Sequence, residues 1–133
     1  GSFDAHTNGI ALQEGLLTDV CGGIYNFYED MKQANQSEDV IMFVFTEFGR
    51  RVRDNGNGTD HGSGGVAFVI GDSVKGGQYS DYPSLAPSDL LEGDLRFNLD
   101  FRSLYSEILE DWLEVDARPI VKNEYEKVGF LKN

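Results

Sequence analysis

Apolar residues recur at three- and four-residue steps between Ile10 and Met31, which predicts an amphipathic α-helix over this stretch. Thr7 or Asn8 can cap its start. The recurring positions are Leu12, Leu16, Leu17, Val20, Ile24, Phe27, Tyr28 and Met31. A single apolar stripe on a helix normally packs on the interior, so we expect this stripe to face the core.

Two short apolar runs follow, Val40 to Phe45 and Val66 to Ile70, and neither alternates with polar residues. Such runs are typical of strands buried on both faces of a mainly parallel sheet. Between them lies the glycine-rich segment Thr46 to Gly65, which we expect to be a loop, and loops of this length in compact domains are usually functional or disordered. Asn55-Gly56 and Asn57-Gly58 are turn signals within it.

A second helix is predicted to begin after Asp100, which is a good capping residue. Its apolar face comprises Phe101, Leu104, Tyr105, Ile108, Leu109, Trp112 and Leu113. The tail from Glu114 to Asn133 is interrupted by Pro119, and we expect an irregular strap across the surface. The order helix, strand, loop, strand, helix predicts an α/β fold.

The 133 residues are enough for one domain, so we expect a single domain over residues 1–133. The formal net charge of −12 argues against general nucleic-acid binding, because such a surface repels phosphates. Cys21 is the only cysteine, so no internal disulfide can form. No apolar run has the roughly 18 residues that a membrane span needs. Gly1-Ser2 resembles a cloning scar, so the sequence does not reveal whether a native leader exists.

The candidate chemistry is concentrated around the two histidines, each of which has an aspartate close by in the sequence. His6 follows Asp4 by two positions, and His61 follows Asp60 directly. Carboxylate oxygens and imidazole nitrogens together are ligands for a divalent metal such as zinc. The alternative is that each pair is a capped turn with a surface histidine.

Charged residues follow the first predicted strand closely. Glu47 lies two residues beyond this strand, where α/β sheets place ligands and catalytic groups. It could equally form an ion pair with Arg50 or Arg51. The arginines Arg50, Arg51 and Arg53 could grip a phosphate or sulfate group. Alternatively, they only neutralise Glu47, Asp54 and Asp60.

The segment VFTEFGRRVRDNGNGTDHGSGGVAFVIGDSVKGG, followed by DFRSLYSEILEDWL, resembles a bacterial domain-of-unknown-function family. That family is sulfatase-like and belongs to the alkaline-phosphatase superfamily. Its DTH, EFGR and DH motifs correspond here to Asp4-Ala5-His6, Glu47-Phe48-Gly49-Arg50 and Asp60-His61. The resemblance covers essentially the whole chain, and it is to the C-terminal portion of the family domain.

The resemblance implies part of an α/β/α sandwich with a central mixed, mainly parallel sheet. It also implies a metal-dependent phosphate- or sulfate-ester hydrolase, acting on a small anionic ester in the full-length protein. Asp4, His6 and His61 are then the first candidates for metal ligands, and Asp60 and Glu47 the second. Zinc is the expected metal, with manganese or calcium as alternatives. Arg50 and Arg51 would hold the anion.

The chain departs from the superfamily pattern in three respects, the first of which is Ala5 in place of the usual threonine. The part that bears the nucleophile has no counterpart here, so we expect little or no hydrolase activity from the isolated chain. Phe48 stands where many relatives place a histidine. The alternative function is a non-catalytic binding or assembly module on a degenerate hydrolase scaffold. Relatives imply a periplasmic or secreted full-length protein, and open sheet edges could drive self-association.

Overall fold

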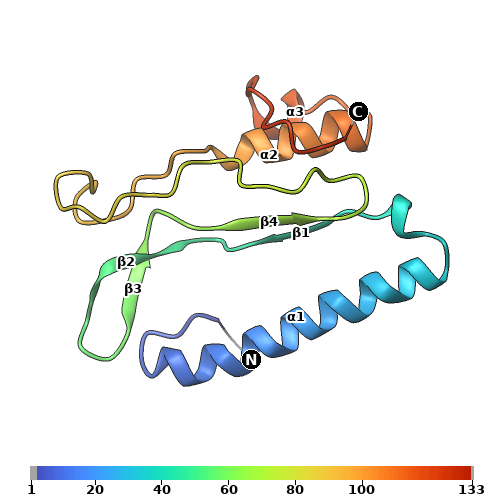
Figure 1. Ribbon diagram of the computed structural model, residues 1–133. Helices are drawn as coiled ribbons and strands as arrows, with labels where there is room; N and C mark the ends of the chain where they lie inside the picture. The colour runs from blue at the N-terminus through green and yellow to red at the C-terminus, as the bar shows by residue number, and fades with distance from the viewer. Residues whose placement is uncertain (1–2, 133) are drawn as a thin grey trace. The chain divides into compact units, whose positions relative to one another are not determined.

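The computed structural model describes residues 3–132 and is mixed α/β (Figure 1). Gly1 and Ser2, which we expected to be a cloning scar, lie outside the described residues, as does Asn133. The chain forms two compact units. The N-terminal unit comprises the residues up to Asp72 together with Ser84–Arg96, and the C-terminal unit comprises Ser73–Pro83 and the residues from Phe97 onward.

The first predicted helix is confirmed as α1 (Gly9–Gln33), which begins one residue before Ile10 and ends two residues after Met31. Asn8 occupies the capping position, but its side chain makes no capping hydrogen bond. The expectation of a core-facing stripe is wrong, because α1 has no fully buried residue among those described. Leu16, Ile24 and Met31 are half-buried, and the tyrosine hydroxyl of Tyr28 donates a hydrogen bond to Asp72. No helix of the described residues is long and apolar enough to cross a bilayer.

The two apolar runs form strands β1 (Met42–Phe45) and β4 (Ala67–Ile70), after a short 3₁₀-helix, η1 (Ser37–Asp39). They pair antiparallel with each other, Met42 opposite Ile70 (Figure 1). Both sheets of the described residues are two-stranded and antiparallel. The apolar runs therefore predicted the positions of the two strands. They did not predict the antiparallel pairing of β1 with β4, because that pairing depends on the path of the segment between them.

The segment Thr46 to Gly65, which we expected to be a loop, contains strands β2 (Gly49–Asp54) and β3 (Thr59–Gly62). These form an antiparallel hairpin with the predicted turn at its tip, closed by a hydrogen bond from Asn55 N to Gly58 O (2.9 Å). Arg50 pairs with His61 and Asp54 with Thr59, so three residues of β2 face only Asp60 on β3. Such a bulge bends a strand and redirects its side chains.

The C-terminal unit contains the second predicted helix, α2 (Phe101–Glu107). Asp100 caps it as expected, accepting a hydrogen bond from Arg102 N at 2.9 Å. The helix continues without a break into η2 (Ile108–Trp112), a π-helical turn. A further short helix, α3 (Arg118–Val121), has Pro119 in its first turn, a position that proline tolerates because the N–H there has no helical partner.

The tail is more ordered than the predicted irregular surface strap, because it supplies buried residues. Phe130 and Leu131 are 2% and 6% exposed, and Ala117 and Val121 are buried with them in this unit. Backbone hydrogen bonds from Lys75 N to Phe130 O and from Lys132 N to Ser73 O attach the tail to the segment after β4. The apolar pair near the end of the chain therefore belongs to the interior of the C-terminal unit.

Candidate metal centre

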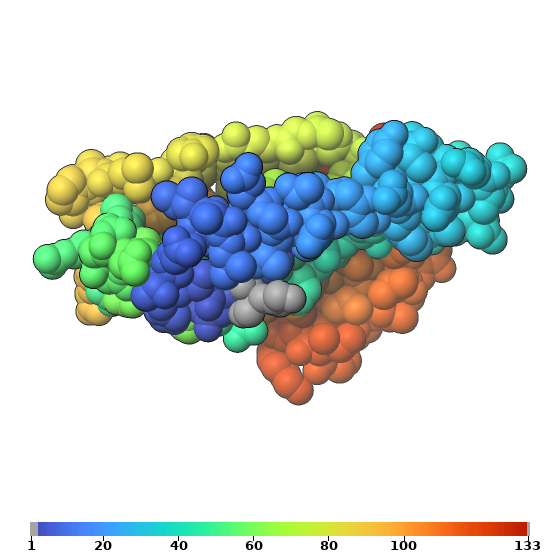
Figure 2. All heavy atoms as spheres, turned by 90° about the horizontal axis from the view of Figure 1, so that it is seen from below, coloured from blue at the N-terminus to red at the C-terminus, as the bar shows by residue number. Residues whose placement is uncertain are grey.

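The N-terminal segment lies against the tip of the β2–β3 hairpin, as the space-filling view shows (Figure 2). Asn8 N donates to Asn57 O at 3.0 Å, and the side chain of Asn55 approaches the carbonyl of His6 at 3.4 Å. The contact is close at Gly58, where an added Cβ would lie 2.4 Å from that same carbonyl oxygen. Only glycine fits here, so the turn sequence determines how near His6 comes to the hairpin.

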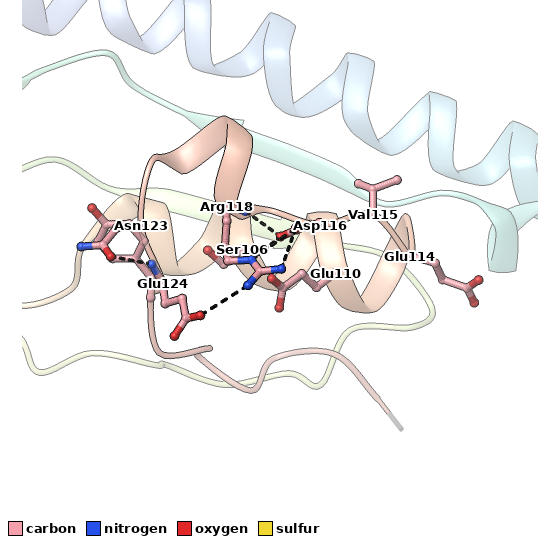
Figure 3. Close-up of a pocket in the computed structure, with 9 residues that line it drawn as sticks. Ser106, Glu110, Glu114, Val115, Asp116, Arg118, Asn123 and Glu124 are labelled. Atoms are coloured by element: carbon pink, nitrogen blue, oxygen red, sulfur yellow. Dashed lines mark hydrogen bonds and ion pairs between the residues drawn. The ribbon is translucent and has the colours of Figure 1, made fainter.

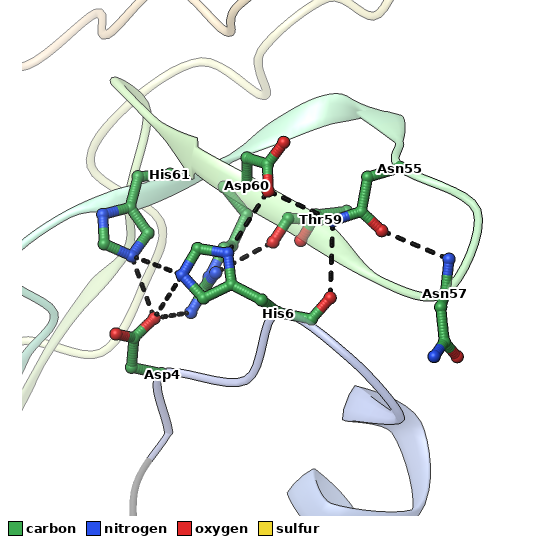
Figure 4. A network of polar contacts seen from close by, with 8 residues as sticks. Asp4, His6, Asn55, Asn57, Thr59, Asp60 and His61 are labelled. Atoms are coloured by element: carbon green, nitrogen blue, oxygen red, sulfur yellow. Dashed lines mark hydrogen bonds and ion pairs between the residues drawn. The ribbon is translucent and has the colours of Figure 1, made fainter.

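Asp4, His6 and His61 meet at this contact (Figure 4). The Nε2 atoms of the two histidines are 3.1 Å apart, and Asp4 Oδ1 lies 3.3 Å from Nε2 of His6 and 2.9 Å from Nε2 of His61. Among the described residues, these three form the group whose side chains lie close enough together to share one metal ion. The first-choice ligands predicted from the sequence are thus brought together from segments more than fifty positions apart.

The three ligand atoms fit a divalent ion in both chemistry and spacing. Zinc bound to nitrogen and oxygen at about 2.0–2.1 Å in tetrahedral geometry separates its ligand atoms by roughly 3.3 Å. The observed sides of 2.9, 3.1 and 3.3 Å lie within a few tenths of an ångström of that value. All three side chains are between 44% and 46% exposed, so a fourth coordination position would face solvent. Catalytic zinc sites have such an open position, whereas structural sites are closed.

Asp60 contacts the other ring nitrogen of His6 rather than the three-atom group. Its Oδ1 accepts from Nδ1 of His6 at 3.2 Å and from Nδ2 of Asn55 at 3.1 Å. With the proton on Nδ1, the Nε2 atom of His6 presents a lone pair toward His61 and Asp4. A carboxylate that orients a ligating imidazole in this way is a common partner of metal sites.

Arg50 and Phe48 hold the other side of the group. The guanidinium of Arg50 donates to Asp4 Oδ1 at 2.6 Å and to the carbonyl of Thr59 at 2.9 Å. The ring of Phe48 stacks on that of His61 with centroids 3.8 Å apart, and the guanidinium of Arg50 lies 5.5 Å from the Phe48 centroid. Ring stacking and the β2–β3 register together fix the direction in which His61 points.

Both carboxylates of the site have a pKa below the usual value of 3.8. The hydrogen bond from His61 lowers the pKa of Asp4 most, and Arg50 lowers it further, although partial burial opposes the shift. For Asp60 the hydrogen bond from Asn55 contributes most to the lower pKa, followed by that from His6. Each group is therefore ionised at neutral pH, as a metal ligand or a carboxylate that orients one must be.

Two other residues singled out in the sequence lie apart from this group. Glu47 is exposed and is not one of the three residues that could share an ion. Arg51 forms an ion pair with Asp94 at 3.5 Å, and its side chain is 48% exposed. Arg50 and Arg51 thus form ion pairs with Asp4 and Asp94, and the charge of Arg51 also contributes to the lowered pKa of Asp60, one of the carboxylates that the neutralising alternative named.

Sequence reasoning did not identify Asn55 as part of the site, and it treated Phe48 only as a departure from a motif. Asn55 was recognised as the first residue of the predicted turn. Its place in a turn, however, does not indicate that its side chain contacts His6 and Asp60. The stacking partner of Phe48 depends on the strand register. Neither contact can be read from spacing along the chain.

A family model described as "Protein of unknown function (DUF1501)" matches residues 1–122. No curated protein and no solved structure matches the chain. The matched range contains Asp4, His6 and His61 together with the residues that orient them. It also covers α1, both sheets and α2.

Proposed function

The chain belongs to the DUF1501 family of proteins of unknown function, and from that premise we propose that it is the C-terminal part of a metal-dependent phosphate- or sulfate-ester hydrolase-like protein. One observation carries the proposal: Asp4 Oδ1 and the Nε2 atoms of His6 and His61 form a triangle with sides of 2.9 to 3.3 Å, open to solvent. The proposal also rests on the resemblance of the Asp-x-His, EFGR and DH motifs to the sulfatase-like family.

In this proposal Asp4, His6 and His61 hold a divalent metal, with zinc foremost and manganese or calcium as alternatives. A metal bound there would polarise an oxygen of a phosphate or sulfate ester and stabilise the charge that develops on it. Asp60 keeps the Nε2 atom of His6 free to ligate. Glu47 is the remaining carboxylate candidate, and it would need a change of position to join the ligand set.

Arg50 is suited to an anionic substrate because it already contacts the ligand group. Its guanidinium is held at two points, Asp4 and the carbonyl of Thr59, so its direction is fixed before any anion arrives. A preorganised guanidinium binds an ester oxyanion with less loss of side-chain freedom than a mobile one. Arg51 would take part only by leaving Asp94.

The resemblance extends the proposal to the whole protein. We propose that β1 and β4 form part of a central mixed, mainly parallel sheet in an α/β/α sandwich. Phe45 and Phe68 on these strands are each 56% exposed, which supports their having further partners in a larger domain. The same resemblance supports a periplasmic or secreted location and a small anionic ester as substrate.

The test is a zinc titration of the chelator-treated chain, followed by isothermal calorimetry and elemental analysis. The expected result is one zinc per chain, lost in His6→Ala and in His61→Ala. Arg53→Ala is the matched control, because this exposed residue of β2 is outside the ligand group and should bind zinc like the wild type. Wild-type protein that retains no zinc, manganese or calcium, or histidine variants that bind as well as wild type, would refute the metal site.

A second candidate function is a non-catalytic binding or assembly module. It is favoured by one observation: the polar groups of the site satisfy one another, with His6 between Asp60 and His61 and with Asp4 on Arg50. Such a network could simply anchor the N-terminal segment to the hairpin. In that case the wild-type protein would bind no metal. His6→Ala would nevertheless loosen the N-terminal segment, and faster amide exchange at residues 5–8 would detect this.

A further inference from the structure

The pocket of the C-terminal unit is lined by charged groups that already satisfy one another (Figure 3). Arg118 donates to the carboxylate of Asp116 at 2.9 Å and lies 3.8 Å from that of Glu124. Lys127 lies 3.1 Å from Glu110. Because these carboxylates are neutralised within the unit, their acidity does not indicate a ligand. A reactive side chain without such contacts lies at the tip of the β2–β3 hairpin.

Three asparagines of the sequence are followed directly by glycine: Asn8, Asn55 and Asn57. An Asn-Gly peptide can deamidate without an enzyme. The backbone nitrogen of the glycine attacks Cγ of the asparagine, which closes a succinimide ring, and the side-chain nitrogen leaves as ammonia with the proton of the glycine N–H. Glycine favours the attack because it has no Cβ to hinder it. Each pair reacts only if its side chain and the following N–H are free to approach each other.

Asn55 is restrained at both of its reacting groups. Its side-chain amide donates to Asp60 at 3.1 Å, and its side-chain oxygen accepts from Asn57 N at 3.2 Å. The N–H of Gly56, which would have to attack, donates to Asp54 at 2.6 Å. Ring closure at Asn55 therefore requires several hydrogen bonds to open first.

Asn8 is restrained by its backbone. Its φ and ψ are 51° and 33°. At this ψ the nitrogen of Gly9 lies on the opposite side of the Cα–C bond from the side chain of Asn8. Gly9 is also the first residue of α1, so the rotation that ring closure needs would disturb the start of the helix.

Asn57 differs from both, because its side-chain amide and the N–H of Gly58 make no hydrogen bond among the described residues. The residue is exposed, and Figure 4 shows its amide directed away from the network around His6. The carbonyl of Asn57 accepts from Asn8 N at 3.0 Å, and this bond restrains the peptide that must rotate. Asn57 is therefore the pair of the three that is freest to react.

We propose that Asn57 is a site of spontaneous deamidation and that its isoaspartate product releases the N-terminal segment from the hairpin. Water opens the succinimide at one of its two carbonyls. Opening at the side-chain carbonyl gives aspartate with the original backbone. Opening at the main-chain carbonyl gives isoaspartate, in which the backbone runs through the former side chain and is longer by one methylene group.

The contact at the hairpin tip has no room for this longer backbone. A Cβ added at Gly58 would already lie 2.4 Å from the carbonyl oxygen of His6. In the isoaspartate, the oxygen that accepts from Asn8 N becomes part of a carboxylate on a side branch. The release would also move Asp4 and His6 away from the hairpin. That effect on metal binding rests on the proposed function, whereas the modification and the release do not.

The test ages the full wild-type chain in mildly alkaline buffer with a chelator, so that no metal takes part. Peptide mapping with electron-transfer fragmentation locates the exchange of NH₂ for OH and separates isoaspartate from aspartate. Modification at Asn57 should be at least about fivefold faster than at Asn55, whose hydrogen bonds must open first. Amide exchange at Asn8 should become faster in proportion to the isoaspartate fraction.

Asn57→Gln should not be modified, because the longer side chain would have to close a larger ring, and it should keep the Asn8 amide protected during ageing. Freshly prepared Asn57→Asp carries the charge of the product on the original backbone and should also stay protected. Asn123→Gln is the matched control and should age like the wild type, since this exposed asparagine precedes Glu124 rather than glycine. An unmodified wild type, equal rates at Asn55 and Asn57, or isoaspartate that leaves exchange at Asn8 unchanged overturns the proposal.

Discussion

Asp60 accepts a hydrogen bond from Nδ1 of His6 at 3.2 Å, although 54 positions separate the two residues in the chain. The contact lies on the opposite edge of the imidazole from Asp4 and His61. It therefore selects the ring nitrogen available to a metal. The sequence pairs Asp4 with His6 and Asp60 with His61. In the structure, however, Asp60 orients His6.

Replacing Asp60 by asparagine should weaken zinc binding by about 10- to 100-fold without changing its stoichiometry, because outer carboxylates orient ligands and raise their basicity. The asparagine side chain would keep an acceptor oxygen but not the charge. Competition with a chromophoric chelator measures the affinity. Asp19→Asn on α1 is the control and should leave it unchanged. A loss as large as that of Asp4→Asn would instead make Asp60 a direct ligand.

Gly58→Ala should impair the site without altering any ligand. The added methyl group would lie 2.4 Å from the carbonyl oxygen of His6 and 2.9 Å from its carbon, and neither backbone atom can rotate away. Overpacking of this kind costs about 1–3 kcal/mol, so zinc affinity should fall by about 5- to 150-fold. Gly22→Ala, in open space on α1, is the matched control. Equal zinc affinity in both variants would show that the segment can dock elsewhere.

The lowered pKa of Asp4 predicts how docking of the N-terminal segment depends on pH. Because the pKa in the folded chain is below 3.8, the interaction stabilises the fold above that pH and is lost as pH falls through the folded value. Carbon-detected NMR titration should give a midpoint below 3.8 for this carboxyl. The midpoint should rise in His61→Ala and, by a smaller amount, in Arg50→Ala. A wild-type midpoint at or above 3.8 would contradict the contacts described.

The sequence predicted those elements whose signal is local. The three- and four-residue spacing in α1, the Asp100 cap and the Asn55–Gly58 turn each depend on neighbours along the chain. Strand β2 could not be recognised, because GRRVRD has one apolar residue and its β-structure depends on pairing with β3. Phe130 and Leu131 were assigned to a surface strap because two apolar residues in a polar tail do not indicate what they pack against.

The candidate site could be predicted as a set of residues but not as an arrangement. Residue chemistry singled out the pairs Asp4/His6 and Asp60/His61, since histidines with nearby carboxylates suit a metal, and the family resemblance placed Asp4, His6 and His61 first. The separate role of Asp60 depends on which ring nitrogen of His6 it contacts. That is settled by the close approach at Gly58 and by the bulge opposite Asp60, and both are tertiary features.

Glu107 should be the most sensitive position for the stability of the C-terminal unit. It is 1% exposed, and its two carboxylate oxygens accept hydrogen bonds from Gly129 N at 2.6 Å and Leu131 N at 2.8 Å. Glu107→Ala removes both acceptors and leaves two N–H groups unsatisfied. Each such group costs about 1–3 kcal/mol, so the free energy of unfolding should fall by roughly 2–6 kcal/mol.

Urea unfolding followed by the fluorescence of Trp112 measures this effect, because the only tryptophan lies in this unit. Glu107→Gln should give an intermediate loss, since its amide oxygen can still accept while its NH₂ group faces a second donor. Glu126→Gln, on the exposed part of the tail, should stay within about 0.5 kcal/mol of wild type. If Glu107→Ala unfolds at the wild-type urea concentration and keeps amide protection at Gly129 and Leu131, then the carboxylate does not hold the tail. The burial of Phe130 and Leu131 alone would then have to account for its attachment.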